Sequence, residues 1–222
     1  DKDGIGGYGI FDVTPDSIIT YEQRIGEPMK RWAALSLTKP YYDRSGKAVK
    51  YPSFAVNEEY PQVKADWLVQ TGAGIYCSPA VWKDKVYVGD DLGFLTCYTL
   101  KSGQKLWNFQ SGKRIVGTPD VADGVVVFGS ADHNIYGLDA RTGKERWRVT
   151  AGEPVLGAVT IEKGVAYIGA SDSTFRAIHI KSGKVLWSYA GIKGYVETKP
   201  LIEGNKVIFG AWDNTLYALD KT

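Results

Sequence analysis

The sequence predicts an all-β fold in which short antiparallel strands recur in a unit of about 40 residues. The first observation is a constant spacing of 40 residues between four tryptophans: Trp67, Trp107, Trp147 and Trp187. The second is a set of strand-length apolar runs that each end at a glycine: Val86–Gly89, Val126–Gly129, Ala166–Gly169 and Val207–Gly210. The third is a composition of 26 Gly, 14 Tyr and 7 Trp, which is typical of short strands joined by tight turns.

Each unit divides into four strands. After the glycine, a polar turn leads to a second apolar run such as Ile135–Leu138, and Asp139–Gly143 then forms a tight turn. The Asp side chain there can bind the backbone, and the Gly can take a positive φ. The tryptophan follows in a further strand, after turn glycines at Gly103, Gly143 and Gly183. Four antiparallel strands per unit make a propeller blade, so residues 65–222 are expected to form a β-propeller with four visible repeats.

The strand count leaves the closure of the ring open. The fourth unit has no Trp-led strand of its own, whereas Ala65–Gln70 precedes any set of strands to which it belongs. If Ala65–Gln70 pairs beside Leu216–Leu219, the ring closes with four blades and covers two exposed edges. Otherwise the four repeats are part of a seven- or eight-bladed ring. Both arrangements agree with the sequence.

Residues 1–64 do not carry the repeat and are expected to form an N-terminal extension. Tyr8–Val13 and Ser17–Tyr21 predict a β-hairpin, with Pro15 at a favoured turn position. A short helix is expected around Glu27–Leu37, and residues 38–64 are expected to be a linker that wraps a surface.

Composition excludes several function classes. The 27 basic and 25 acidic residues leave a net charge of +2, which predicts no nucleic-acid partner. No apolar run approaches the roughly 20 residues of a membrane-spanning helix, so the chain is not expected to be transmembrane.

Catalytic chemistry is not predicted. Cys77 and Cys97 occupy small-residue positions of the repeat and are expected to be buried free thiols on the first and third strands of one blade. Two strand spacings separate them by roughly 9–10 Å, whereas a disulfide tolerates about 7 Å between Cα atoms. The sequence contains no spaced metal-ligand cluster, nucleophile elbow or phosphate-binding glycine loop. We therefore expect no catalytic, cofactor-binding or metal-binding residues.

One face of the propeller is the candidate interaction surface, because loops between blades and turns between second and third strands share it. Acidic residues recur in these turns, and they either cap the turns or form a ring that binds a cation. Exposed aromatic and basic side chains are typical of interaction surfaces. Trp212 is not explained by the repeat, so it either binds a partner or packs on the N-terminal segment. The candidate residues on this face are Tyr76, Asp91, Lys113, Arg114, Asp132, His133, Asp172, Lys193, Tyr195, Trp212 and Asp213.

The repeat resembles that of quinoprotein-alcohol-dehydrogenase-like propellers. The shared pattern is Gly-x-x-Asp-x-x-x-Tyr-x-Leu-Asp-x-x-Thr-Gly-Lys-x-x-Trp, and it extends over residues 65–222. This family includes pyrroloquinoline quinone (PQQ) enzymes and the outer-membrane assembly lipoprotein of Gram-negative bacteria. The resemblance implies that an active PQQ enzyme would carry adjacent cysteines, a catalytic Asp and Glu/Asn ligands for calcium. The sequence has no adjacent cysteines, and we expect no quinone binding.

Residues 6–21 are similar to the trailing hairpin of calcineurin-like metallophosphoesterases, which implies a preceding enzyme domain. The function expected first is a non-catalytic binding or scaffolding propeller, outside the cytoplasm by family resemblance, with a protein or small polar ligand on one face. The alternatives are an accessory domain of a metallophosphoesterase and a PQQ-dependent dehydrogenase.

Overall fold

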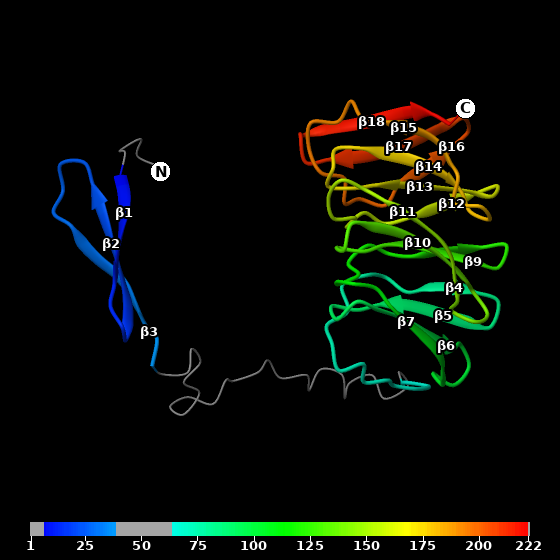
Figure 1. The fold of residues 1–222 in the computed structure, drawn as a ribbon, viewed down its shortest axis with the longest axis horizontal. Helices are drawn as coiled ribbons and strands as arrows, with labels where there is room; N and C mark the ends of the chain where they lie inside the picture. Colours follow the sequence, from blue (N-terminus) through cyan, green and yellow to red (C-terminus); the bar gives the residue numbers. More distant parts are fainter. Residues whose placement is uncertain (1–6, 39–63, 222) are drawn as a thin grey trace. The chain divides into compact units, whose positions relative to one another are not determined.

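The computed structural model describes residues 7–38 and 64–221 (Figure 1). The chain divides into two compact units, Asp1–Val63 and Lys64–Thr222, each of which is described here by itself. All regular secondary structure in the described residues is β-strand. The linker expected over 38–64 lies outside the described residues except at its two ends.

The N-terminal unit is a three-stranded antiparallel sheet in the order β1-β2-β3. The expected hairpin is confirmed by β1 (Gly7–Val13) and β2 (Ser17–Arg24), which pair across the predicted turn. The prediction of a helix around Glu27–Leu37 is wrong, because Lys30–Ser36 forms strand β3 and pairs with β2. Gly26, with φ of 82°, begins the reversal, and pairing with β2 overrides the helical preference of this Ala- and Leu-containing segment.

Three complete blades follow, each a four-stranded antiparallel meander. The first blade consists of β4 (Ala80–Trp82), β5 (Lys85–Gly89), β6 (Phe94–Thr99) and β7 (Lys105–Gln110). The second consists of β8 (Asp120–Ala122), β9 (Val125–Gly129), β10 (Asn134–Asp139) and β11 (Glu145–Thr150). The third consists of β12 (Thr160–Glu162), β13 (Val165–Gly169), β14 (Phe175–His179) and β15 (Val185–Tyr189). The predicted four-stranded repeat is therefore confirmed.

The fourth blade has three strands: β16 (Leu201–Glu203), β17 (Lys206–Ala211) and β18 (Thr215–Asp220). Residues 65–70 form no strand and do not pair with β18, so the closed four-bladed alternative is not the arrangement found. Trp67 nevertheless packs on the first blade, where its Nε1 donates to the Leu100 carbonyl oxygen at 2.9 Å, as Trp147 of the second blade does to Ile180 of the third. Within the described residues, the outer edge of β18 has no partner strand, and Leu216 on it is 75% exposed.

Tryptophans fill the wedges between blades, as their spacing predicts. Trp147 on β11 lies opposite Gly137 in the β10–β11 ladder, and a Cβ on Gly137 would be 2.1 Å from its ring. The other side of the ring meets Gly183 of the third blade, and Nε1 donates to the Ile180 carbonyl oxygen at 2.6 Å. Trp67 and Trp107 make the corresponding contacts with the turn glycines Gly103 and Gly143. Trp187 binds the Lys221 carbonyl oxygen in the fourth blade.

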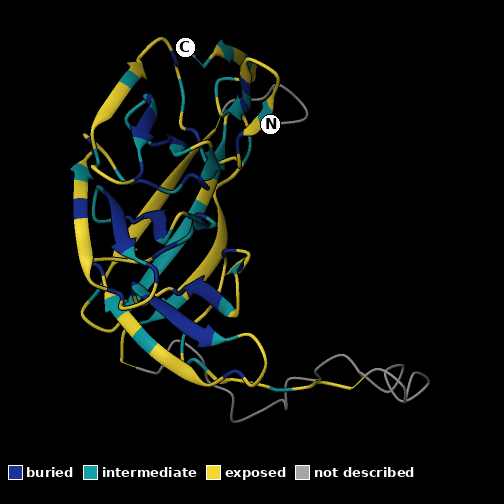
Figure 2. Ribbon diagram, turned by 90° about the vertical axis from the view of Figure 1, so that its right-hand side faces the viewer, coloured by how far each residue is buried: buried dark blue, intermediate teal, exposed yellow. Residues whose placement is uncertain are grey.

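The core lies between successive blades rather than in one central cluster. Most buried apolar side chains gather in three groups, formed between the first and second, second and third, and third and fourth blades. A smaller fourth group in the first blade consists of Cys77, Val88 and Tyr98. The second strand of each complete blade is buried, whereas the fourth strand is mostly exposed, as the dark and light ribbons of Figure 2 show. The short first strands contact one another in sequence, β4 with β8, β8 with β12, and β12 with β16. The blades are therefore arranged as successive sectors around a common axis, and their turns gather at two opposite ends.

Candidate functional site

We define the loop face as the end of the propeller that carries the turns between second and third strands and the loops that join blades. Each joining loop is bonded to the turn of the blade that it enters. The carbonyl oxygens of Arg114 and Pro154 accept from the amides of Ala131 and Ser171, both at 2.9 Å. The same loops bind the preceding blade as well, since Ile115 N donates to the Asp90 carbonyl oxygen. These repeated bonds hold the candidate residues on one continuous surface.

The carboxylate of Asp132 accepts hydrogen bonds from its own turn and from the adjacent joining loop. It accepts from Gly112 N at 2.7 Å, from Asn134 N at 3.1 Å and from the Tyr136 hydroxyl at 2.6 Å. Burial acts to raise the pKa of Asp132, but the hydrogen bonds from Tyr136 and the backbone amides lower it overall. The side chain is therefore an ionised clamp between a turn and the neighbouring joining loop, with its oxygens occupied.

The other two repeated aspartates have the same construction. Asp172 accepts from Gly152 N at 3.0 Å and pairs with Arg176, while Asp213 accepts from Lys193 N at 2.9 Å and from a tyrosine hydroxyl. Each joins a turn to the preceding joining loop, as Asp132 does. The structure thus places all three carboxylates in turns, and turn chemistry accounts for their recurrence.

The first blade departs from this scheme in a way that the sequence did not reveal. Here the turn is capped by Asp90, which is buried and accepts from Leu92 N at 3.0 Å and Phe94 N at 2.9 Å. Asp91 follows it, and only its backbone amide is engaged, with the Gly74 carbonyl oxygen. The carboxylate of Asp91 has no hydrogen bond or ion pair with the residues that the structure describes. Two adjacent aspartates in the sequence were the signal that one of them is not needed for the turn.

The uncommitted Asp91 lies at a hollow of about 550 Å³ on the loop face. Lys113 and Arg114 of the next joining loop line the same hollow, together with Leu92, Ala131 and Pro154. Leu92 is 60% exposed. In the described part of the chain, neither the Lys113 ammonium nor the Arg114 guanidinium has a carboxylate partner. The hollow therefore offers one acidic, two basic and several apolar groups to a partner, which is a mixed surface suited to protein recognition.

Aromatic side chains occupy another part of the loop face. Trp212 is 70% exposed, and its Nε1 donates to Glu197 at 3.1 Å. Tyr195 lies beside Trp212, because the Trp212 amide donates to the Tyr195 carbonyl oxygen. The side chain of Tyr195 is also exposed. Tyr76 is exposed in the loop before the first blade. His133 instead lies close to its neighbouring loop, with Nδ1 at 3.3 Å from the Gly152 carbonyl oxygen, and its φ of 72° marks a turn residue.

The two cysteines are buried free thiols. Cys97 lies on β6, the third strand, as expected, whereas Cys77 precedes β4 rather than lying on it. Cys77 takes the place of Gly117 and Gly157 and exchanges hydrogen bonds with the backbone of Gly89. Burial raises the pKa of both thiols, that of Cys97 to about 11.

We expect neither thiol to react with a disulfide reagent at pH 8 in the folded protein, because both are buried and protonated. Two equivalents should react in denaturant without prior reduction. The measurement is a timed titration with 5,5′-dithiobis(2-nitrobenzoate). Zero equivalents in denaturant would mean that the cysteines are joined, contrary to the structure.

Two further observations concern the described residues alone. Among them, no group of three His, Cys, Asp or Glu side chains is placed to hold a metal ion. Within the same ranges, no helix has the length and hydrophobicity that crossing a membrane requires.

Comparison with known proteins gives a family match over most of the chain. The family described as outer membrane protein assembly factor BamB matches residues 52–144 and 129–222. The outer membrane protein assembly factor BamB of Xanthomonas campestris pv. campestris is 29% identical in a 114-residue alignment that covers 44% of this chain and 28% of the relative. The chain therefore spans less than a third of that relative's length.

Solved structures show the same fold. BamB from Moraxella catarrhalis superposes with a TM-score of 0.64 at 15% identity, over 70% of this chain and 49% of that one. The computationally designed Ika4 protein has a TM-score of 0.65 at 22% identity, over 71% of this chain and 98% of the design. The computationally designed Ika8 protein has a TM-score of 0.60 at 18% identity, over 95% of this chain and 57% of the design.

Proposed function

Because the chain belongs to the family of the outer membrane protein assembly factor BamB, we propose that it is a non-catalytic scaffold that binds protein partners outside the cytoplasm. The process we propose is the assembly of outer-membrane proteins, which the name of the Xanthomonas relative states for that protein. The fold supplies rigid blades, and function then depends on the groups that their loops present.

The observation that carries the proposal is the set of side chains on the loop face that the repeat does not use. The carboxylate of Asp91 and the cations of Lys113 and Arg114 surround a hollow with an exposed leucine. Turn formation explains the other acidic residues but not this group. An exposed Trp212 on the same face adds a side chain of the type that dominates binding energy at protein interfaces.

The proposal predicts that charge reversal in the hollow impairs assembly in the cell. In a strain that lacks the gene, K113E/R114E should fail to restore the folded fraction of outer-membrane proteins, measured by their heat-modifiable migration on gels. The matched control is K144E/K181E, which makes the same change in net charge at exposed lysines on the opposite end of the blades. Equal restoration by both variants, or no loss of folded protein in the deletion strain, would contradict the proposal.

A second candidate function rests on the N-terminal sheet. Phe11 and Trp32 are among several large apolar side chains exposed on this unit, and such a surface is typical of one that another domain covers. From this surface, together with the resemblance of residues 6–21, we propose an accessory domain of a metallophosphoesterase as the alternative function. Metal-dependent hydrolysis of bis-p-nitrophenyl phosphate by the protein isolated from its source organism would support that alternative, and its absence with Mn²⁺ would count against it.

A further inference from the structure

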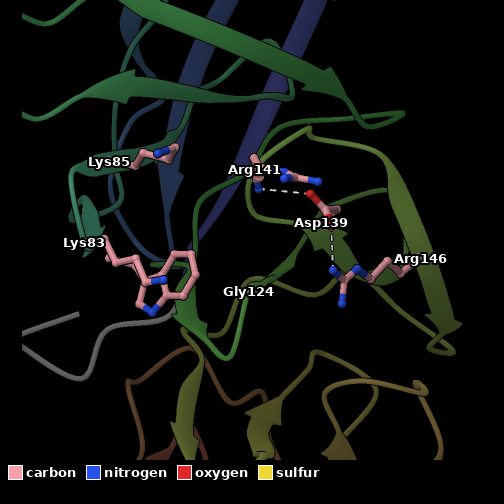
Figure 3. Close-up of a pocket in the computed structure, with 7 residues that line it drawn as sticks. Lys83, Lys85, Gly124, Asp139, Arg141 and Arg146 are labelled. Carbon is pink, nitrogen blue, oxygen red and sulfur yellow. Dashed lines mark hydrogen bonds and ion pairs between the residues drawn. The ribbon is translucent and has the colours of Figure 1, made fainter.

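A second cavity lies at the opposite end of the blades from the loop face. We define the hairpin face as the end that carries the turns between first and second strands and between third and fourth strands. The cavity has a volume of about 350 Å³ and lies between the first two blades. Trp82, Lys83 and Lys85 line it from the first blade, and Gly124, Asp139, Arg141 and Arg146 line it from the second (Figure 3).

Two of these lining residues are departures from the repeat. Trp82 has Ala122, Glu162 and Glu203 at the corresponding positions of the other units. Arg146 replaces Leu106 and Leu186, whereas the position of Lys85 is occupied by Val125, Val165 and Lys206. Blade packing in the other units is achieved without an aromatic ring at the position of Trp82. The presence of this ring at the cavity therefore calls for a reason other than the fold.

The charged side chains at this largely apolar cavity are predominantly basic. Four basic side chains line it, and Asp139 is the acidic residue among the lining groups. Asp139 is itself engaged, because it accepts from Arg146 at 2.5 Å and from Arg141 N at 3.0 Å. The Arg146 hydrogen bond, followed by those in the turn, lowers the pKa of Asp139 to about 2, so the pair stays ionised at neutral pH.

Two of the cations remain available to a ligand. Lys85 is largely buried and pairs with Asp84 at 2.7 Å. Lys83 and Arg141 are exposed, and within the described residues neither has a carboxylate within salt-bridge distance. Figure 3 shows Lys83 and Arg141 on opposite sides of the cavity. The cavity thus presents a net positive charge from two exposed side chains that have no carboxylate partner among the described residues.

Trp82 provides a fixed apolar surface between these cations. The ring packs against the core formed by the first two blades, and it lies over Gly124, where an added Cβ would be 3.8 Å from the ring. The Lys83 ammonium lies 4.4 Å from the ring centroid. A partly buried indole held in this way can stack against a flat ring or the apolar face of a sugar.

We propose that this cavity binds a small organic phosphate, with its ring against Trp82 and its phosphate neutralised by Arg141 and Lys83. A guanidinium and an ammonium are the side chains suited to phosphate, and the volume is that of a small-molecule site rather than of a protein groove. The site is separate from the loop face, and it does not depend on the proposed scaffold function.

Isothermal titration of the full chain with adenosine 5′-monophosphate, glucose 6-phosphate and inorganic phosphate tests the proposal, with adenosine as the uncharged control. We expect one site per chain for at least one organic phosphate, weaker binding of inorganic phosphate, and none for adenosine. Arg141→Gln should weaken binding about tenfold or more, as loss of a charge-assisted hydrogen bond does. Lys181→Gln changes the equivalent position of the third blade and should leave binding unchanged.

Trp82→Leu should weaken the binding of the organic phosphates and leave the binding of inorganic phosphate unchanged. Because Trp82 contacts the core, its loss can also disturb folding, whereas Arg141 is exposed and its variant keeps the test decisive. Equal losses in Arg141→Gln and Lys181→Gln would overturn the proposal. So would the absence of binding at millimolar ligand, or tighter binding of hexaglutamate than of every phosphate.

Discussion

Replacement of Trp147 by Ala is expected to lower the free energy of unfolding by roughly 3–5 kcal/mol, the usual loss for a buried aromatic side chain. Trp147 is 8% exposed and fills the space between Gly137 of its own blade and Gly183 of the next. Its removal also leaves the buried Ile180 carbonyl oxygen without its donor. Urea denaturation followed by far-ultraviolet circular dichroism measures the change.

Trp212→Ala is the control, because this side chain is 70% exposed. Its replacement should lower the free energy of unfolding by less than about 1 kcal/mol. Comparing the losses in unfolding free energy of Trp147→Phe and Trp107→Phe tests the hydrogen bond from Trp147 Nε1 to the Ile180 carbonyl oxygen. The buried Nε1 of Trp107 has no partner in the described structure, since the Tyr87 hydroxyl donates to the corresponding Ala140 carbonyl oxygen. Trp107→Phe should therefore cost less than Trp147→Phe. Equal losses for Trp147→Ala and Trp212→Ala would show that the repeated tryptophan is not the wedge between blades.

The second large effect is expected at Gly129, the glycine that ends the second strand of its blade. A Cβ there would lie 2.4 Å from Val155 Cγ1 and 2.8 Å from the Val155 carbonyl oxygen, in the loop to the next blade. Gly129→Ala should destabilise by about 1–3 kcal/mol or more, because the joining loop has to move. The measurement is again the midpoint and slope of urea denaturation.

Gly210 is the matched control, because it occupies the same repeat position in the fourth blade. A Cβ on Gly210 meets only Thr198 Cγ2, at an ordinary distance of 3.7 Å. The free energy of unfolding of Gly210→Ala should therefore lie within about 0.5 kcal/mol of the wild-type value. If Gly210→Ala is as costly as Gly129→Ala, a further element packs on the fourth blade, and the open arrangement is incorrect.

The repeat made most of the propeller predictable. A Trp every 40 residues and a glycine at the end of each second strand reflect contacts that recur in each blade, so their pattern carries the three-dimensional packing. The family resemblance and the strands of the blades are confirmed, except that Ala65–Gln70 forms no strand and Cys77 precedes β4. The N-terminal hairpin is also confirmed, from its own turn signal at Pro15. Closure was not predictable, because both arrangements place Trp67 against the first blade, and the local sequence of Ala65–Gln70 does not decide whether it also pairs with β18.

The N-terminal strand β3 was missed for a different reason. Its Ala- and Leu-containing segment has helical propensity, and the pairing with β2 that decides its conformation is not local. At the loop face, sequence reasoning gathered the right turns but could not separate a capping aspartate from a free one. Asp90 and Asp91 are adjacent, and only the hydrogen bonds of Asp90 distinguish them. The cavity at Trp82 was also missed, although its departures from the repeat were readable in the sequence.

The most direct test of the scaffold function is a site-specific photo-crosslinking map in living cells. Benzoylphenylalanine placed at Tyr195 or Trp212 reports on the loop face, and the same residue at Lys144 or Lys181 reports on the hairpin face at exposed turn positions. We predict that both loop-face positions crosslink to the same envelope protein, that K113E/R114E abolishes these crosslinks, and that the hairpin-face positions give none. Equal crosslinking of that protein from both faces, or crosslinks unaffected by K113E/R114E, would contradict a partner bound at the loop face.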